Sequence, residues 1–191
     1  MEIKKEIFEN ILELASSLQQ IPSPTFLEGE RTLFLQKVFT QEGLKDVMID
    51  DIGNLYGRLP GRKESNPLIV SAHLDTVFSE DTDLHLEVLL DKIKGPAIGD
   101  NSIGLAGLLA LVWSLKEQKI TLPGDLWLVA NVCEEGLGNL RGMRAVVEKF
   151  GQQPIAYLIL EGMALGRIYH RGLGVERWRI KVSTQGGHSW T

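Results

Sequence analysis

Cysteine is nearly absent from this sequence: Cys133 is the only one among 191 residues. A single thiol excludes an internal disulfide, and on its own it cannot build a cysteine-based zinc site. No run approaches the ~20 consecutive apolar residues that a membrane-spanning helix needs. The charged first residues lack the apolar core of a signal peptide. We therefore expect a cytoplasmic protein with no membrane partner.

An excess of positive charge is also missing. The 20 Lys and Arg residues face 25 Asp and Glu residues, which gives a formal net charge of −5. This balance, without any basic block, argues against nucleic acid as a partner. The sequence also contains neither a phosphate-binding loop ending in Gly-Lys-Ser/Thr nor a Gly-x-Ser-x-Gly nucleophile elbow.

Helical and extended patterns alternate along the chain. The apolar spacing predicts helices over 3–20 and 26–43. A stretch rich in Leu and Ala indicates a helix over 102–118, and a further helix is predicted over 139–150, between two buried strands. Strands are predicted in a hairpin over 46–59, in a β-arm around 84–98, and in buried runs over 68–72, 125–132 and 156–160. Strand–helix–strand alternation indicates an α/β fold with a sheet of mostly parallel strands.

The character of the sequence changes near 170–174. Residues 175–184 alternate apolar and polar side chains, which predicts a strand with one solvated face. We place a domain boundary here, with one domain over 1–172 and the start of a second over 173–191. A segment of about twenty residues is too short to bury a core of its own.

Four polar clusters fall where predicted elements begin or end. His73 and Asp75 follow the first buried strand, and Asp100 precedes the helix over 102–118. The pair 134–135 follows the second buried strand, and Glu161 follows the third. Because the carboxyl ends of parallel strands meet at one edge of a sheet, we expect these side chains to lie close together.

One imidazole with several carboxylates and no thiol suits zinc or another borderline divalent ion. Bare carboxylates this close would raise one another's pKa, and a metal removes that conflict. Asp75 is placed to accept a hydrogen bond from the second ring nitrogen of His73. Glu134 and Glu135 point in different directions from an extended backbone, so one can bind metal while the other acts as a base.

Each cluster also has a plainer interpretation. His73 alone is more often a structural histidine, and Asp100 before a helix can be a cap. Glu134, Glu135 and Glu161 can be solvated charges. The loop 136–142 is similar to a dinucleotide glycine motif, but its third glycine comes one residue late and two glutamates precede it. A nucleotide-binding α/β domain therefore stays an alternative, and the coincidence of four clusters favours metal.

The ordered set His73-Leu74-Asp75-Thr76-Val77, Gly99-Asp100-Asn101, Glu134-Glu135-Gly136 and Glu161-Gly162 resembles the two-zinc exopeptidase and amidohydrolase family. This is the family of aminoacylase, acetylornithine deacetylase, succinyl-diaminopimelate desuccinylase, tripeptidase and glutamate carboxypeptidase. The resemblance implies a three-layer α/β sandwich that hydrolyses an amide bond in small peptides or N-acyl amino acids. It also implies a cis peptide bond after Asp100.

The same resemblance implies roles for individual residues. Asp100 would bridge two zinc ions, with cobalt or manganese as substitutes. His73 and Glu161 would complete one site and Glu135 would bind the other ion. Glu134 would be the general base and Asp75 the residue that orients His73.

The resemblance further implies an inserted lid domain that supports dimerisation, beginning with the strand over 175–184. His188, in Gly187-His188-Ser189, resembles the lid histidine that supports the tetrahedral intermediate. The family takes a last metal-binding histidine from beyond the lid, and no residue here can be assigned to that role. We therefore expect the N-terminal part of such an enzyme, with a catalytically inactive metal-binding fragment as the alternative.

Overall fold

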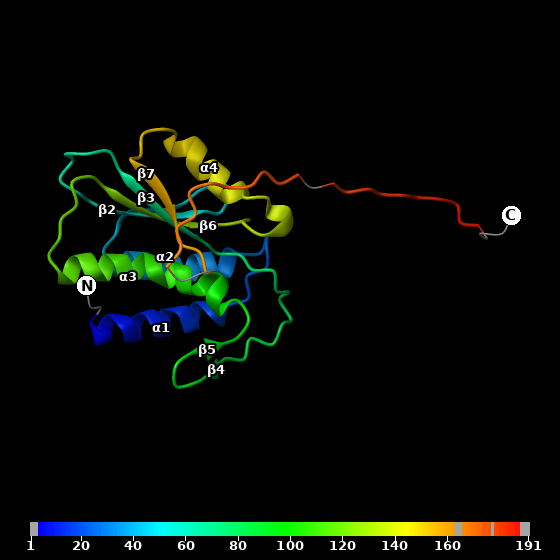
Figure 1. Ribbon diagram of the computed structural model, residues 1–191, viewed down its shortest axis with the longest axis horizontal. Helices are drawn as coiled ribbons and strands as arrows, with labels where there is room; N and C mark the ends of the chain where they lie inside the picture. Colours follow the sequence, from blue (N-terminus) through cyan, green and yellow to red (C-terminus); the bar gives the residue numbers. More distant parts are fainter. Residues whose placement is uncertain (1–3, 163–165, 177, 188–191) are drawn as a thin grey trace.

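The computed structural model describes residues 4–162, 166–176 and 178–187. The strands of its main sheet are β1 (Lys45–Ile49), β2 (Leu55–Leu59), β3 (Leu68–His73), β6 (Leu126–Asn131) and β7 (Ala156–Ile159). The helices are α1 (Lys5–Gln19), α2 (Gly29–Gln41), α3 (Ile103–Glu117) and α4 (Arg141–Phe150). Three helices, α1, α2 and α3, cover one face of the sheet, and α4 covers the other (Figure 1). This arrangement confirms the predicted α/β fold with a central sheet between helical layers.

The strand order in the sheet is β1-β2-β6-β3-β7. Strand β3 is parallel to both β6 and β7, whereas β2 is antiparallel to β1 and β6. Four of the five strands therefore run in the same direction, and β2 alone runs against them. As a result, the chain leaves β3, β6 and β7 at the same edge of the sheet.

The central strands bury side chains on both faces, which explains their nearly continuous apolar sequences. In β3, Val70 and Ala72 belong to the core beneath α1, α2 and α3, while Ile69 faces the smaller core beneath α4. In β6, Leu128 likewise belongs to the larger core and Val129 to the smaller one. This alternation follows from the two-residue period of a strand.

Helix α3 is the main helix of the larger core. Its buried Leu105, Leu108, Leu109 and Val112 pack into the core shared with α1 and the sheet. The stretch Ile98–Glu117 is long and apolar enough to cross a membrane by length and composition alone. Its burial in the core accounts for that composition without a membrane.

Helix α2 ends in a turn that its sequence specifies. Gly43 has a φ of 75°, and its N–H donates to the oxygen of Thr40 at 3.0 Å. The N–H of Leu44 then donates to the oxygen of Phe39 at 3.2 Å. This pair of bonds is a Schellman cap, for which glycine is the favoured residue.

Outside the main sheet, the predicted β-arm is present as the short strands β4 (Glu87–Val88) and β5 (Ile93–Lys94). The strand expected over 175–184 is not formed. Its described residues, 175–176 and 178–184, are exposed, and the segment runs away from the sheet (Figure 1). A strand needs a hydrogen-bonded neighbour, and no described residue pairs with this segment. The assignment of 173–191 to a lid domain stays a prediction.

Candidate metal centre

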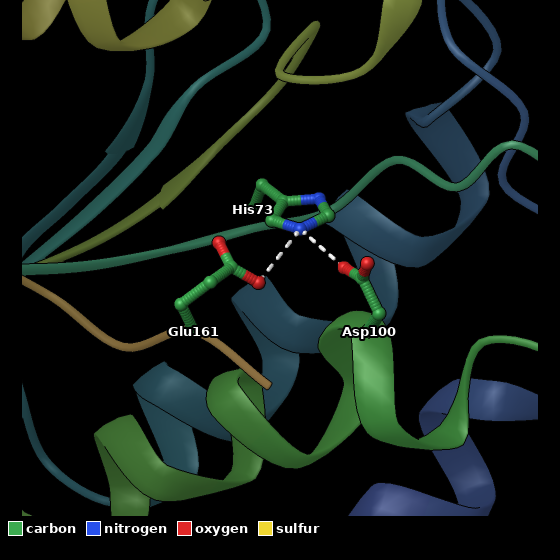
Figure 2. A group of neighbouring side chains, drawn as sticks. All are labelled: His73, Asp100 and Glu161. Carbon is green, nitrogen blue, oxygen red and sulfur yellow. Dashed lines mark hydrogen bonds and ion pairs between the residues drawn. The ribbon is translucent and has the colours of Figure 1, made fainter. Parts of the chain in front are cut away.

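His73 lies at the centre of the polar cluster at the carboxyl edge of the sheet. It is the last residue of β3, and its side chain is 2% exposed. The ring Nδ1 donates to the main-chain oxygen of Asp75 at 2.9 Å, because a carbonyl can only accept. A neutral ring in this tautomer presents the lone pair of Nε2. That nitrogen lies 2.9 Å from Oδ1 of Asp100 and 3.6 Å from Oε1 of Glu161 (Figure 2).

The Asp75 carboxylate binds main-chain amides in addition to lying near the His73 ring. Its Oδ1 is 3.6 Å from Nδ1 of His73, so the close contact to the ring comes from the main chain instead. The buried carboxylate accepts the N–H of Glu134 at Oδ1 and the N–H of Glu135 at Oδ2, both at 2.9 Å. Oδ2 also accepts the hydroxyl of Thr25 at 3.0 Å. Burial alone would raise the pKa of Asp75, but His73 and the two amides lower it.

Asp100 comes from a kinked turn, η1 (Ile98–Ser102), that leads into α3. The Asp100–Asn101 peptide bond is cis, as the resemblance implied. The buried Asn101 side chain donates to the oxygen of Leu160 at 2.8 Å and accepts the N–H of Gly104 at 3.1 Å. Asn101 thus ties the turn carrying Asp100 to the segment carrying Glu161, a role that the sequence pattern did not reveal.

Glu134 and Glu135 enter the cluster through a sharp turn after β6. Cys133 has a φ of 55°, an unusual conformation for a residue with a side chain. Ligand atoms of Glu134, Glu135 and His73 lie within 4.8 Å of one another, as do those of His73, Asp100 and Glu161. The structure therefore brings together all the residues predicted to form the rim.

The crowded charges shift the pKa values of the cluster. Burial raises the pKa of Glu134, and so do Glu161, Asp75 and Asp100. Burial raises the pKa of Glu135 as well, together with Asp100 and Glu134. Burial would lower the pKa of His73, but Asp75 and Glu161 raise it to about 11. Without a metal, a proton on the imidazole is what offsets the negative charge.

The donor set fits a borderline divalent cation. Two ligands around one tetrahedral ion with bonds of ~2.1 Å stand about 3.4 Å apart. The distances from Nε2 of His73 to Asp100 and Glu161, 2.9 and 3.6 Å, lie on either side of that value. Imidazole nitrogen and carboxylate oxygen are ligands that zinc, cobalt and manganese accept.

The residue before α2 and the first turn of that helix also support the centre, which sequence reasoning missed. Arg31 is 1% exposed and donates to the main-chain oxygens of Ile21 and Leu74. Burial lowers its pKa to about 10, against the effect of Asp75. Glu28, also buried, accepts the N–H of Cys133 at 3.0 Å. A buried arginine and glutamate look like surface charges in a sequence, so only the fold reveals them. His188 lies outside the described residues.

Comparisons with known proteins agree with this geometry. Residues 54–167 match the sequence model of peptidase family M28. None of the curated proteins compared with the chain matches it in sequence.

Solved structures of peptidases share the fold. The aminopeptidase PepT of Bacillus cereus has a TM-score of 0.69 and 25% identity, over 80% of this chain and 43% of that one. A tripeptidase of Staphylococcus aureus has a TM-score of 0.65 and 25% identity, over 82% and 44%. The YxeP protein of Bacillus subtilis, described as a dinuclear metal-binding peptidase of the M20 family, has a TM-score of 0.61 and 17% identity, over 82% and 43%. The chain thus spans less than half the length of these structures.

Proposed function

This chain belongs to peptidase family M28, and from that premise we propose that it takes part in metal-dependent hydrolysis of an amide bond in small peptides or N-acyl amino acids. The observation that carries the proposal is the convergence of His73 with two pairs of carboxylates, Asp100 with Glu161 and Glu134 with Glu135. Peptidases of the same fold support the reaction class.

We assign the residues as follows. His73, Asp100 and Glu161 would hold one zinc ion, and Asp100 with Glu135 would contribute to the second; cobalt or manganese can substitute. A bound divalent ion supplies a Lewis acid that polarises the scissile carbonyl and lowers the pKa of water from ~15.7 toward ~7. The Nδ1 hydrogen bond of His73 to the main chain keeps Nε2 directed at this site.

Glu134 would act as the general base. Its raised pKa, caused first by burial and then by the neighbouring carboxylates, suits a group that takes a proton from water and later delivers it to the leaving amine. Asp75 would set the direction of the catalytic groups, since it contacts His73 and the amides of Glu134 and Glu135.

The remaining parts of the proposal concern the assembly. A lid that begins near 173 would support a homodimer, with His188 stabilising the oxyanion. The free and buried thiol of Cys133 suits a reducing compartment, so we propose a cytoplasmic location.

The Glu134→Gln variant tests the function. It should bind zinc, yet hydrolyse tripeptides and N-acyl amino acids about 10²- to 10⁴-fold more slowly than the unchanged chain. Glu148→Gln, which changes an exposed glutamate of α4, is the matched control. Equal turnover by the Glu134 variant would contradict the assignment of the base. Zinc binding without turnover by the unchanged chain would favour the alternative of an inactive metal-binding fragment.

A further inference from the structure

We propose that Glu28 is a positioning residue of the metal centre: together with Asp75 it fixes the backbone of Cys133–Glu135 and so determines where the Glu134 and Glu135 carboxylates stand. The assignment of a role to those two carboxylates rests on the proposed function. The hydrogen bonds from Cys133–Glu135 to Glu28 and Asp75, which we call the clamp, are present in the metal-free chain and can be measured there.

Three consecutive amides after β6 each meet a carboxylate oxygen. The N–H of Cys133 donates to Oε1 of Glu28 at 3.0 Å, and the next two N–H groups donate to the two oxygens of Asp75. Glu28 is 5% exposed and Asp75 is fully buried. Hydrogen bonds to an ionised acceptor are about twice as strong as neutral ones, so the clamp restrains this backbone firmly.

The position of Glu28 in its own helix shows that the contact is specific. Glu28 is the residue before α2, where a side-chain oxygen could cap the helix, yet it makes no such bond. Its main-chain oxygen accepts the N–H and the hydroxyl of Thr32 instead. The side chain reaches a residue 105 positions further along the chain.

The backbone that Glu28 holds needs such support. Cys133 adopts a φ of 55°, which is disfavoured for a residue with a β-carbon and persists only where the surroundings enforce it. This conformation turns the chain away from the direction of β6 and toward His73. Without the Glu28 bond the turn would be freer to relax, and the two following carboxylates would lose their fixed placement.

The segment 23–28, which ends at Glu28, also holds the end of β3 that carries His73. The hydroxyl of Thr25 donates to Asp75, and the hydroxyl and main-chain oxygen of Ser23 bind the backbone of Leu74 and Thr76. Residues 23–28 therefore connect the strand end that carries His73 with the turn that carries Glu134 and Glu135. Within this segment, Glu28 makes the contact to the turn, through the N–H of Cys133.

Amide exchange resolved by residue, measured on the metal-free chain, tests the clamp. In the unchanged protein the amides of Cys133, Glu134 and Glu135 should be protected. Glu28→Ala should speed exchange at Cys133 by about tenfold or more, because a hydrogen bond to a charged group is lost. Glu28→Gln keeps an acceptor oxygen and should restore most of the protection. Thr32→Val, which weakens the same helix start without touching Cys133, should leave these amides unchanged.

Zinc titration gives a second and separate readout. In Glu28→Ala the ion that uses Glu135 should bind about 10- to 100-fold more weakly, as is typical when a partner of a ligand is removed. The ion at His73, Asp100 and Glu161 should keep its affinity. If zinc does not bind at all, the proposed function fails while the exchange data still decide the clamp. Unprotected amides at 133–135 in the unchanged chain would overturn the proposal, even if the variants fail to fold.

Discussion

Replacing Asp75 by Asn should destabilise the metal-free domain by about 2–4 kcal/mol, although the two side chains have almost the same shape. The carboxylate accepts three hydrogen bonds, from the amides of Glu134 and Glu135 and from the hydroxyl of Thr25. An asparagine has one acceptor oxygen and one NH₂ group in their place. Whichever way it turns, one of the two main-chain amides faces a donor.

The magnitude follows from that mismatch. One charge-assisted hydrogen bond worth about 1.5–3 kcal/mol is lost, and a buried N–H is left without its acceptor at a further cost of roughly 1–3 kcal/mol. Partial relaxation of the turn makes the sum an upper limit. For a chain of this length the loss should lower the melting temperature by roughly 5–15 °C.

Urea unfolding at neutral pH, followed by circular dichroism, measures this change directly. Asp91→Asn, at an exposed position of the β-arm, is the control and should stay within about 0.5 kcal/mol of the unchanged chain. Equal stability of Asp75→Asn and the unchanged chain would show that the amides do not depend on the carboxylate.

Three further predictions concern the metal centre and the sheet. Elemental analysis after dialysis against a weak chelator should find nearer one zinc ion than two per chain, because the described residues assigned to the second ion are only Glu135 and the shared Asp100. Two retained ions would contradict this prediction. Gly162→Ala should weaken zinc binding by at least about tenfold. The added β-carbon would lie 1.7 Å from the oxygen of Gly99 and would push apart the segments that carry Glu161 and Asp100. Gly172→Ala, whose β-carbon would have no atom within 4 Å, should leave zinc binding unchanged. Burial and the Asp50 carboxylate raise the pKa of Tyr56, so this side chain stabilises the fold fully below pH ~10 and progressively less above it. The free energy of unfolding of Tyr56→Phe should therefore fall less between pH ~9 and ~11 than that of the unchanged chain.

The sequence was sufficient to predict the elements and the edge at which the site lies. The nearly continuous apolar run of β3 and the helical spacing of α1 are local signals, and parallel strands place their ends together whatever the details of the core. His73, Asp100, Glu134, Glu135 and Glu161 could therefore be assigned to one cluster from their positions after or before these elements.

The contacts that hold the cluster in shape depend on distances that no local pattern contains. The Glu28–Cys133 bond spans 105 residues, and Asn101 reaches Leu160 across 59. The strand predicted over 175–184 illustrates the opposite failure. Its alternation is a correct local signal, but a strand also requires a neighbour, which the described part of the chain does not give it.

The carboxylates near the centre divide into two kinds, and the division indicates what each is for. Asp75 receives two main-chain amides and has a lowered pKa. The carboxylates of Glu134 and Glu135 receive no hydrogen bond within the described part of the chain, and their pKa values are raised. A fold that needed all three for stability would satisfy all three, since a buried charge without partners costs free energy. The backbone donors go instead to the residue that supports the turn, which leaves the outer pair with acceptor oxygens for an ion and a proton.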